Sequence, residues 1–142
     1  MALTGSCLCG ACTFSATPVA DEAGACHCSM CRKFSGGVFI VVDCSGTLEF
    51  AKDAPITRFQ SSPWGERVFC SRCGSSLAWQ SRDGHIAVAS VQAFADPGRF
   101  PVTREIFIDC KPDSYGLAGD TVTMTEAEFM AQHTPGQEGG TT

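Results

Sequence analysis

The sequence predicts a mainly β domain. Short segments rich in β-branched and aromatic residues recur along the chain, and turn signals separate them at short intervals. Short strands at this spacing are typical of a sandwich-like or barrel-like all-β architecture. The 142 residues fit one domain, and a hydrophobic content of 44% with 10 Phe supplies its core.

The expected elements follow one another from residue 11 to residue 109. Residues 37–43 carry the strongest strand prediction, because β-branched and aromatic side chains follow a double glycine. Strands are also expected over 11–16, 24–28, 47–50, 56–60, 67–69, 76–80, 86–91 and 104–109, with turns at 43–46, 62–65 and 83–84. Residues 29–34 are expected to form a turn or two of helix.

A short helix is predicted near the C-terminus. Thr125 and Glu128 have the spacing of a capping box, and Met124 and Phe129 have that of a hydrophobic staple around it. The helix is expected to end near His133, because Thr, Pro and Gly follow.

Composition limits the location and the partners of the chain. The domain is expected to span residues 1–133, with residues 134–142 as a disordered tail. The longest apolar run, 38–42, is far shorter than the roughly 20 residues of a membrane helix, and no secretory signal is present, so a cytoplasmic protein without membrane contact is expected. A formal charge of −5, with Arg32 and Lys33 as the only dense basic spot, argues against a nucleic-acid partner.

Cysteine is several times more abundant than in ordinary proteins, with 10 in 142 residues. In a cytosolic chain this abundance indicates metal or catalytic thiols rather than disulfides. Seven of the ten fall in three tight groups, and such close neighbours commonly converge on one ion. The other three, which are interpreted as core residues, are Cys12, Cys44 and Cys110.

Two of the groups together supply the four ligands of a closed zinc site. Structural zinc takes four thiolate or imidazole ligands in a tetrahedron. The second cysteine of each pair, Cys9 and Cys73, is followed by a glycine, which lets the backbone turn tightly around a metal. The first cysteines of the two pairs are Cys7 and Cys70. Cys12 is a rival to Cys7, because it forms a C-x-x-C pair with Cys9, but its alternating context favours a buried strand position.

The third group indicates an open zinc site. In an extended segment Cys26 and Cys28 point the same way, and Cys31 returns after one turn. His27 alternates away from them, so no fourth ligand is clearly offered, and three protein ligands with an open position are typical of catalytic zinc. The alternative is a second structural zinc that a distant ligand completes.

The charge of such an open site favours thiol chemistry. Three thiolates on a divalent cation leave the site at about −1, which suits an incoming thiol better than the activation of water. The neighbouring pair Arg32 and Lys33 is either a solvated pair or an anion contact beside the site. Backbone amides around Ser35 and Gly36 are candidates for stabilising an oxyanion.

The cysteine groups and their flanking residues resemble the glutathione-dependent formaldehyde-activating enzyme family, which also includes centromere protein V. The resemblance rests on residues 5–10, 26–36 and 69–75. It implies a β-tent of antiparallel sheets around a structural zinc, and a second zinc that is catalytic. The implied ligands are Cys7, Cys9, Cys70 and Cys73 for the first ion, and Cys26, Cys28 and Cys31 for the second.

The resemblance also implies an activity, that of a carbon–sulfur lyase which joins glutathione and formaldehyde into S-hydroxymethylglutathione. Zinc is the implied cofactor, at two ions per chain when fully loaded, and the second ion is expected to bind more weakly. Arg32 and Lys33 then become candidates for the carboxylates of a glutathione-like thiol. Where the family commonly has a His and a Trp, this chain has Glu105 and Tyr115. The alternative function is a zinc-stabilised protein-binding module without catalysis.

Overall fold

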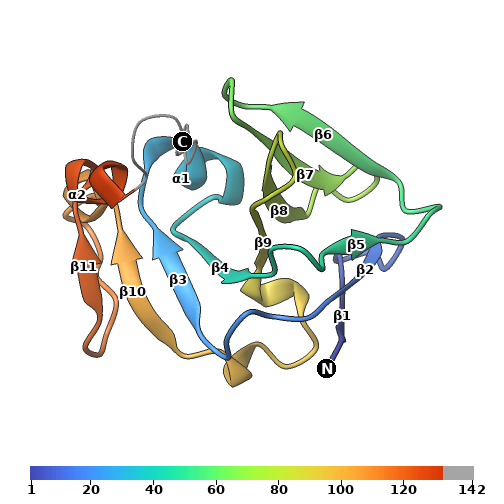
Figure 1. Ribbon diagram of the computed structural model, residues 1–142, viewed down its shortest axis with the longest axis horizontal. Coiled ribbons are helices and arrows are strands. Elements are labelled where there is room, and N and C mark those ends of the chain that lie inside the picture. The colour runs from blue at the N-terminus through green and yellow to red at the C-terminus, as the bar shows by residue number, and fades with distance from the viewer. Residues whose placement is uncertain (133–142) are drawn as a thin grey trace.

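The computed structural model describes residues 1–132, and its strands form two sheets (Figure 1). The smaller sheet is antiparallel and contains, in order, β1 (Leu3–Ser6), β2 (Thr13–Ala16) and β5 (Glu49–Phe50). The larger sheet has eight strands in the order β11-β10-β3-β4-β9-β8-β7-β6. Its strands are β3 (Ala23–Cys26), β4 (Phe39–Asp43), β6 (Ile56–Gln60), β7 (Gly65–Cys70), β8 (Ser76–Ser81), β9 (Ala87–Ser90), β10 (Val102–Ile106) and β11 (Val122–Met124). The predicted mainly β class is confirmed.

Two short helices complete the described chain. α1 (Ser29–Ser35) begins after Cys28, whose sulfur accepts a hydrogen bond from a backbone amide of the first turn, and it ends at Gly36 in the left-handed region. α2 (Glu126–Gln132) is the predicted short C-terminal helix. Three single turns of 3-10 helix lie at Val91–Ala93, Pro97–Arg99 and Ile108–Cys110. None of the helices within residues 1–132 is long and apolar enough to cross a membrane.

The predicted capping box of α2 is confirmed. The backbone N–H of Thr125 donates to the Glu128 carboxylate at 2.8 Å, and the backbone N–H of Glu128 donates to the Thr125 hydroxyl at 3.1 Å. Met124 and Phe129 belong to the same hydrophobic cluster, as the staple requires. The predicted end of the helix near His133 and the predicted tail over 134–142 lie outside the described residues.

The structure corrects the strand predictions at both ends of the chain. The strand expected over 104–109 stops at Ile106, because Phe107 adopts a left-handed backbone with φ of 57° and turns the chain. This strand is not the last one either, since β11 pairs with β10. At the other end, β1 forms where no strand was expected. The pairs of β10 with β3 and with β11 are parallel, and the remaining pairs in both sheets are antiparallel.

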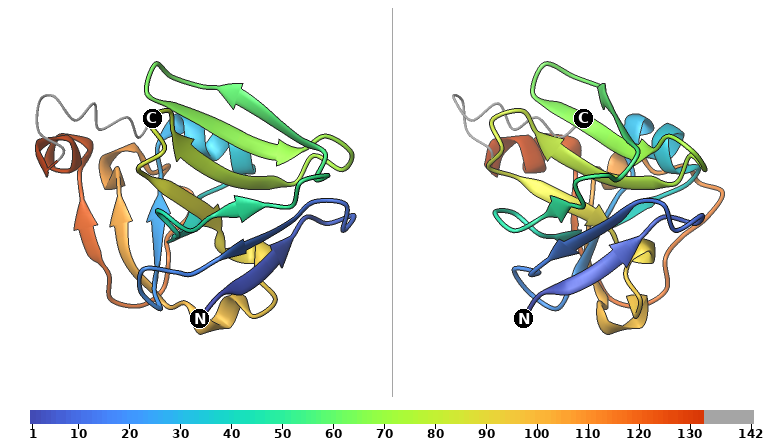
Figure 2. Two further views of the ribbon diagram at one scale, coloured as in Figure 1. Left: turned by 45° about the vertical axis from the view of Figure 1, so that its right-hand side comes forward. Right: turned by 90° about the vertical axis from the view of Figure 1, so that its right-hand side faces the viewer.

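The core divides into three clusters. The first joins the two sheets: Phe14 of β2 packs edge-on against Phe94, with ring centroids 5.5 Å apart, and the same cluster contains Val42 of β4 and Ala89 of β9. β2 therefore packs alongside the larger sheet (Figure 2). The other two clusters are centred on cysteine groups, so the sites described next are built into the packing of the domain.

Candidate metal centres

Four cysteines from distant parts of the chain meet at one end of the fold. Cys7 and Cys9 lie in the turn between β1 and β2, Cys70 ends β7, and Cys73 lies in the turn between β7 and β8. Their sulfur atoms all lie within 4.8 Å of one another. The Cys7–Cys9 and Cys9–Cys70 sulfur distances are 3.6 and 3.9 Å. A zinc–sulfur bond of about 2.3 Å places tetrahedral ligands roughly 3.8 Å apart, so this cluster has the dimensions of a zinc site.

The backbone around this cluster is shaped for thiolates. Gly74, which follows Cys73, has φ of 78°, a conformation that the predicted tight turn requires and that glycine adopts without strain. The backbone N–H of Cys73 donates to the Cys70 sulfur at 3.4 Å. Hydrogen bonding, above all from the Ser75 hydroxyl, lowers the pKa of Cys73 to about 5. Such donors favour the charged form that a metal ligand must take.

Cys12, the rival ligand, lies beside the cluster. It is fully buried, and its backbone N–H donates to the Cys7 sulfur at 3.3 Å. Burial raises the pKa of the Cys12 thiol to about 12. The four sulfur atoms that the structure groups together are those of Cys7, Cys9, Cys70 and Cys73.

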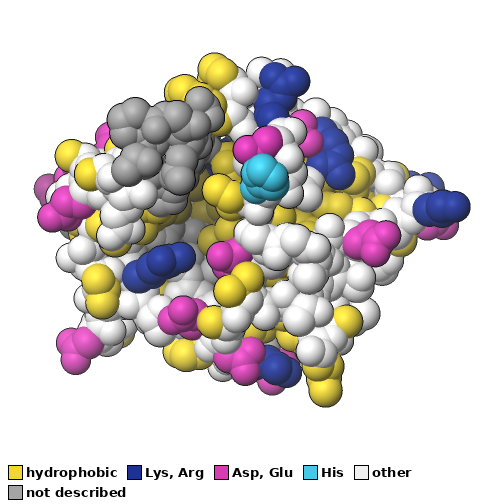
Figure 3. Space-filling view, viewed as in Figure 1, with side chains coloured by type: hydrophobic (Ala, Val, Ile, Leu, Met, Phe, Trp, Pro, Cys, Tyr) yellow, Lys and Arg dark blue, Asp and Glu magenta, His cyan; other side chains and the backbone are white. Residues whose placement is uncertain are grey.

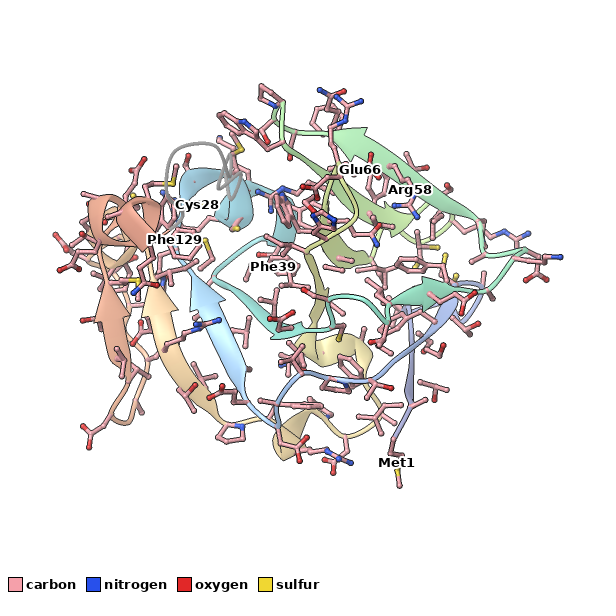
Figure 4. The ribbon with its side chains drawn as sticks, viewed as in Figure 1. Met1, Cys28, Phe39, Arg58, Glu66 and Phe129 are labelled. Carbon is pink, nitrogen blue, oxygen red and sulfur yellow. The ribbon has the colours of Figure 1, made fainter. Side chains whose placement is uncertain are left out.

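The second cluster lies where β3 passes into α1. Cys26 ends β3, Cys28 precedes the helix, and Cys31 lies in its first turn. All three side chains are buried, and their sulfur atoms lie within 4.8 Å of one another. Phe129 of α2 points toward Cys28 and belongs to the hydrophobic cluster that surrounds the three (Figure 4). Within residues 1–132, no fourth His, Cys, Asp or Glu joins this group.

The three thiols cannot all ionise without a cation. The hydrogen bond between Cys26 and Cys28 lowers the pKa of Cys28 to about 2, and the same interaction raises the pKa of Cys26 far above its ordinary value. One thiolate is therefore stabilised at the expense of its neighbours. A bound divalent cation would remove this conflict, so the chemistry of the donor set fits a metal such as zinc.

Arg67 is a buried cation beside this cluster that sequence reasoning missed. Its side chain extends from β7 and is only 2% exposed, and its Nη1 donates to the Cys31 sulfur at 3.4 Å. The guanidinium also lies over the Phe34 ring, 5.3 Å from the centroid. Its charge contributes to lowering the pKa of Cys28. With Arg67 counted, a zinc held by three thiolates would have a locally neutral surrounding, whereas the cysteines and the zinc alone would carry a charge of about −1.

His27 lies between Cys26 and Cys28 in the sequence, and its side chain forms hydrogen bonds on the side of the backbone that faces away from the cysteine cluster. It is fully buried, and its ring nitrogens lie 2.7 Å from a Glu105 carboxylate oxygen and 2.8 Å from the Tyr115 hydroxyl. Thr121 donates to the other Glu105 oxygen at 2.6 Å. Burial by itself would raise the pKa of Glu105, but the hydrogen bonds from Thr121 and His27 outweigh it and lower the pKa. This network agrees with the expectation that His27 points away from Cys26 and Cys28.

A cavity of about 370 Å³ opens on the second cluster. Cys26 and Cys31 lie in its wall, and Phe39 and Trp79 contribute apolar surface. Figure 3 shows this face of the molecule hollowed, with hydrophobic side chains exposed inside the hollow. The volume lies within the range of small-molecule sites, roughly 300–1,000 Å³. A ligand in the cavity would therefore approach two of the three sulfur atoms.

Three of the four predicted substrate contacts line a different cavity from Cys26 and Cys31. Lys33, Ser35 and Gly36 line a second and larger cavity, of about 1360 Å³, together with Cys7 and Cys73 of the first cluster. Arg32 donates through Nε to the backbone carbonyl of His27 at 3.0 Å. The cation in the wall of the smaller cavity is Arg104 of β10, which lies next to Gly24 of β3.

Trp79 is held against the backbone of Gly65, and this contact yields a stability prediction. A Cβ atom at Gly65 would lie 2.2 Å from the indole, so Gly65→Ala must displace Trp79 from the cavity wall. We expect a loss of roughly 1–3 kcal/mol in the free energy of unfolding, measured by urea denaturation. Gly37→Ala is the matched control, because nothing lies within 4 Å of a Cβ there. Equal stability of the two variants would contradict the packing described.

Comparisons with known proteins agree with the geometry. A family profile described as glutathione-dependent formaldehyde-activating enzyme matches residues 2–110, well over half of the chain. A Schizosaccharomyces pombe protein named an uncharacterized lyase is 29% identical over 128 residues, which cover 89% of this chain and 93% of that protein. A Halomonas elongata protein, whose name assigns it provisionally to the glutathione-dependent formaldehyde-activating enzymes, is 39% identical over 87 residues, 54% of this chain and 55% of its own length. The crystal structure of a Rhodobacter sphaeroides protein superposes on this chain with a TM-score of 0.59 and 24% sequence identity. The alignment covers 71% of this chain and 100% of the Rhodobacter sphaeroides chain, which indicates a shared fold.

Proposed function

Because the chain belongs to the glutathione-dependent formaldehyde-activating enzyme family, we propose that it is a zinc-dependent lyase-type enzyme acting on the adduct of a small thiol and a small aldehyde. Glutathione and formaldehyde are the first pair to test. The observation that carries the proposal is the group of three buried cysteines, Cys26, Cys28 and Cys31. Two of them, Cys26 and Cys31, border a cavity of suitable size. The same family membership supports carbon–sulfur bond chemistry as the reaction class.

The two clusters are assigned different roles. Cys7, Cys9, Cys70 and Cys73 would hold a structural zinc, since four sulfur ligands close the coordination sphere. Cys26, Cys28 and Cys31 would hold a second zinc with one position open toward the cavity. Bound there, zinc would keep an incoming thiol in its nucleophilic thiolate form.

The chain's own residues prepare this site in three ways. Arg67 balances the negative charge of the cysteines, through its contact with Cys31. Phe39 and Trp79 give the cavity an apolar wall, which lowers the local dielectric constant and so strengthens electrostatic interactions near it. His27, clamped by Glu105, fixes the backbone that carries the first two sulfur ligands.

Arg104 is proposed as the contact for a substrate carboxylate. It lines the cavity that contains Cys26 and Cys31. Its backbone takes part in the sheet, but its side chain forms neither a hydrogen bond nor an ion pair with residues 1–132. Arg104 pairs with Gly24 of β3, and Cys26 lies two residues further along the same strand. The side chains of Arg104 and Cys26 therefore point to the same face of the sheet, from positions about 7 Å apart along the strand direction. Lys33, Ser35 and Gly36 border the larger cavity, so we assign them no contact with this substrate.

The test is a measurement of adduct exchange by NMR. Glutathione and formaldehyde are mixed with the zinc-loaded protein, and the exchange rate between free formaldehyde and S-hydroxymethylglutathione is measured against a protein-free sample. We expect the rate to rise in proportion to protein concentration and to fall to the protein-free value after metal removal. An unchanged rate with glutathione and also with cysteine as the thiol would contradict the proposed function.

The two metals are expected to leave in a fixed order. The second site has three protein ligands within six consecutive positions, so its metal closes no long loop, whereas the first site joins segments about 60 residues apart. A chelator should therefore remove the zinc of the three-cysteine site first, while the far-ultraviolet circular dichroism stays unchanged. The chain should unfold only when the zinc of the four-cysteine site is removed. Simultaneous loss of both metals with unfolding would contradict the two roles.

A further inference from the structure

The cavity at the second cluster carries two opposite charges that do not neutralise each other. Arg104 of β10 and Asp43, the last residue of β4, both line it. Within residues 1–132, no ion pair joins the two or involves either side chain. Figure 3 shows basic and acidic side chains at the rim of the hollow. A zwitterion, which carries both signs of charge, is the class of ligand that complements such a pair.

The sheet places these charges and the cysteine cluster on one face. Arg104 is opposite Gly24, which lies two residues before Cys26 on β3. Cys26 is opposite Phe39, and Asp43 is four residues further along β4. Side chains an even number of residues apart on a strand point to the same face, and four residues of strand span about 14 Å. The cavity therefore has a sulfur end and an acidic end.

Arg104 is directed from its own strand toward β4. A Cβ atom at Gly24 would be 3.3 Å from Nε and 3.5 Å from Cγ of Arg104, so the arginine packs on the bare backbone of this glycine. The strand beyond β3 in the sheet is β4. The guanidinium therefore extends over β3, toward the strand that carries Asp43.

Asp43 keeps one carboxylate oxygen for a ligand. Its Oδ1 accepts hydrogen bonds from the backbone N–H and the hydroxyl of Ser45, at 3.0 and 2.6 Å, whereas Oδ2 has no hydrogen-bond partner within residues 1–132. The other carboxylate at this end of the cavity belongs to Glu22, which is exposed and accepts a hydrogen bond from the Thr103 hydroxyl at 2.7 Å. Asp43 is half-buried, so its free oxygen is the better placed partner for a ligand cation.

We propose that the acidic end of this cavity binds the α-amino acid group of a thiol substrate. Asp43 accepts a hydrogen bond from the ammonium, and Arg104 donates to the carboxylate on the same carbon. The inference rests on the proposed function, because the thiol sulfur is held at the other end, by the cysteine cluster. The two ends leave roughly 10 Å between the sulfur and the nitrogen of the ligand. Cysteine is too short for this distance, whereas an extended peptide that links glutamate to cysteine through the glutamate side chain is long enough.

Three thiols that differ only at the amino acid group test this subsite. Glutathione carries both the ammonium and the carboxylate. Glutaryl-cysteinylglycine lacks the ammonium, and γ-aminobutanoyl-cysteinylglycine lacks the carboxylate. All three share the cysteinylglycine part, so a ratio of two affinities cancels the binding of sulfur to the metal. The affinities are measured by NMR titration of the 15N-labelled, zinc-loaded protein.

The variants assign each charge to one residue. Asp43→Asn removes the negative charge and keeps an oxygen for Ser45, so the turn is retained. The parent should bind glutathione about 10-fold more tightly than the glutaryl analogue, and Asp43→Asn should bind the two about equally. Arg104→Gln should instead lose the preference for glutathione over the aminobutanoyl analogue and keep its preference over the glutaryl analogue. Glu22→Gln makes the same charge change at the same end of the cavity, and this control should keep both preferences.

The outcomes separate the subsite from the proposed function. If the parent binds all three thiols equally, the subsite is wrong and the proposed function stands. An equal loss of preference in Asp43→Asn and Glu22→Gln would also overturn the subsite, because it would indicate a diffuse effect of charge and not a contact. Should none of the thiols bind to the zinc-loaded parent, the proposed function fails and the subsite falls with it.

The parent protein also decides if a variant does not fold. Glutathione should then shift the backbone amide signals of Asp43 and Ser45, and the glutaryl analogue should leave them in place. Equal shifts with both thiols would contradict the assignment of Asp43.

Discussion

Replacing Cys73 with serine is expected to unfold the chain, the largest effect of any single substitution considered. Cys73 and Cys70 join the β7–β8 turn to the β1–β2 turn through one metal-sized cluster. Binding of structural zinc contributes on the order of 10 kcal/mol to folding, which is comparable with the whole stability of a domain, about 5–15 kcal/mol. The variant should be insoluble, or should lack the circular dichroism of a folded β protein and bind less than one zinc.

Cys12→Ala is the control for this prediction, because it also tests the rival ligand. Cys12 is buried beside the cluster, and its loss should cost only packing, about 1–2 kcal/mol in the free energy of unfolding. A soluble Cys73→Ser variant as heat-stable as the parent would show that the cluster does not hold the fold. Unfolding of Cys12→Ala with retention of structure in Cys7→Ala would reverse the ligand assignment.

Cys31→Ser should abolish activity without unfolding the chain. Cys31 is one of the three cysteines that the structure groups together within residues 1–132, and it also contacts Arg67. Loss of the second zinc removes several kcal/mol of transition-state stabilisation, which corresponds to a decrease in kcat/KM of at least about 100-fold. Thermal unfolding should stay within a few degrees of the parent, because the first cluster is intact.

Cys110→Ser is the matched control for Cys31→Ser. Cys110 packs against the same hydrophobic cluster as Cys31 but is not among the grouped sulfur ligands. Its substitution should leave both the zinc content and kcat/KM close to those of the parent. Full activity in Cys31→Ser, or an equal loss in both variants, would contradict the role given to the three cysteines.

The sequence alone is informative where the signal is local. The grouping of the cysteines, the capping box at Thr125 and the strand over 56–60 depend on spacing within a few residues, and the structure reproduces each of them. Local spacing also explains why His27 faces away from its neighbours.

What depends on sheet register was not predictable. Arg67 was within an expected strand, but nothing local shows that its face of β7 meets the Cys31 sulfur of a distant helix. Trp79 and Arg104 reach the cavity for the same reason, through pairings that only the whole sheet fixes. Lys33 was associated with the open site by proximity in sequence. Successive residues on a helix are about 100° apart, so Lys33, two positions after Cys31, points to nearly the opposite side of α1. Lys33 therefore borders a different cavity from Cys31.

The central claim is that the metal at Cys26, Cys28 and Cys31 has an open position that accepts a small thiol. The most direct measurement is the visible absorption of the protein with cobalt in the second site during titration with glutathione. The account predicts a saturable change in the cobalt bands that Cys31→Ser lacks. A spectrum that glutathione leaves unchanged throughout the titration would mean that the site is closed, and the proposed thiol chemistry would be wrong.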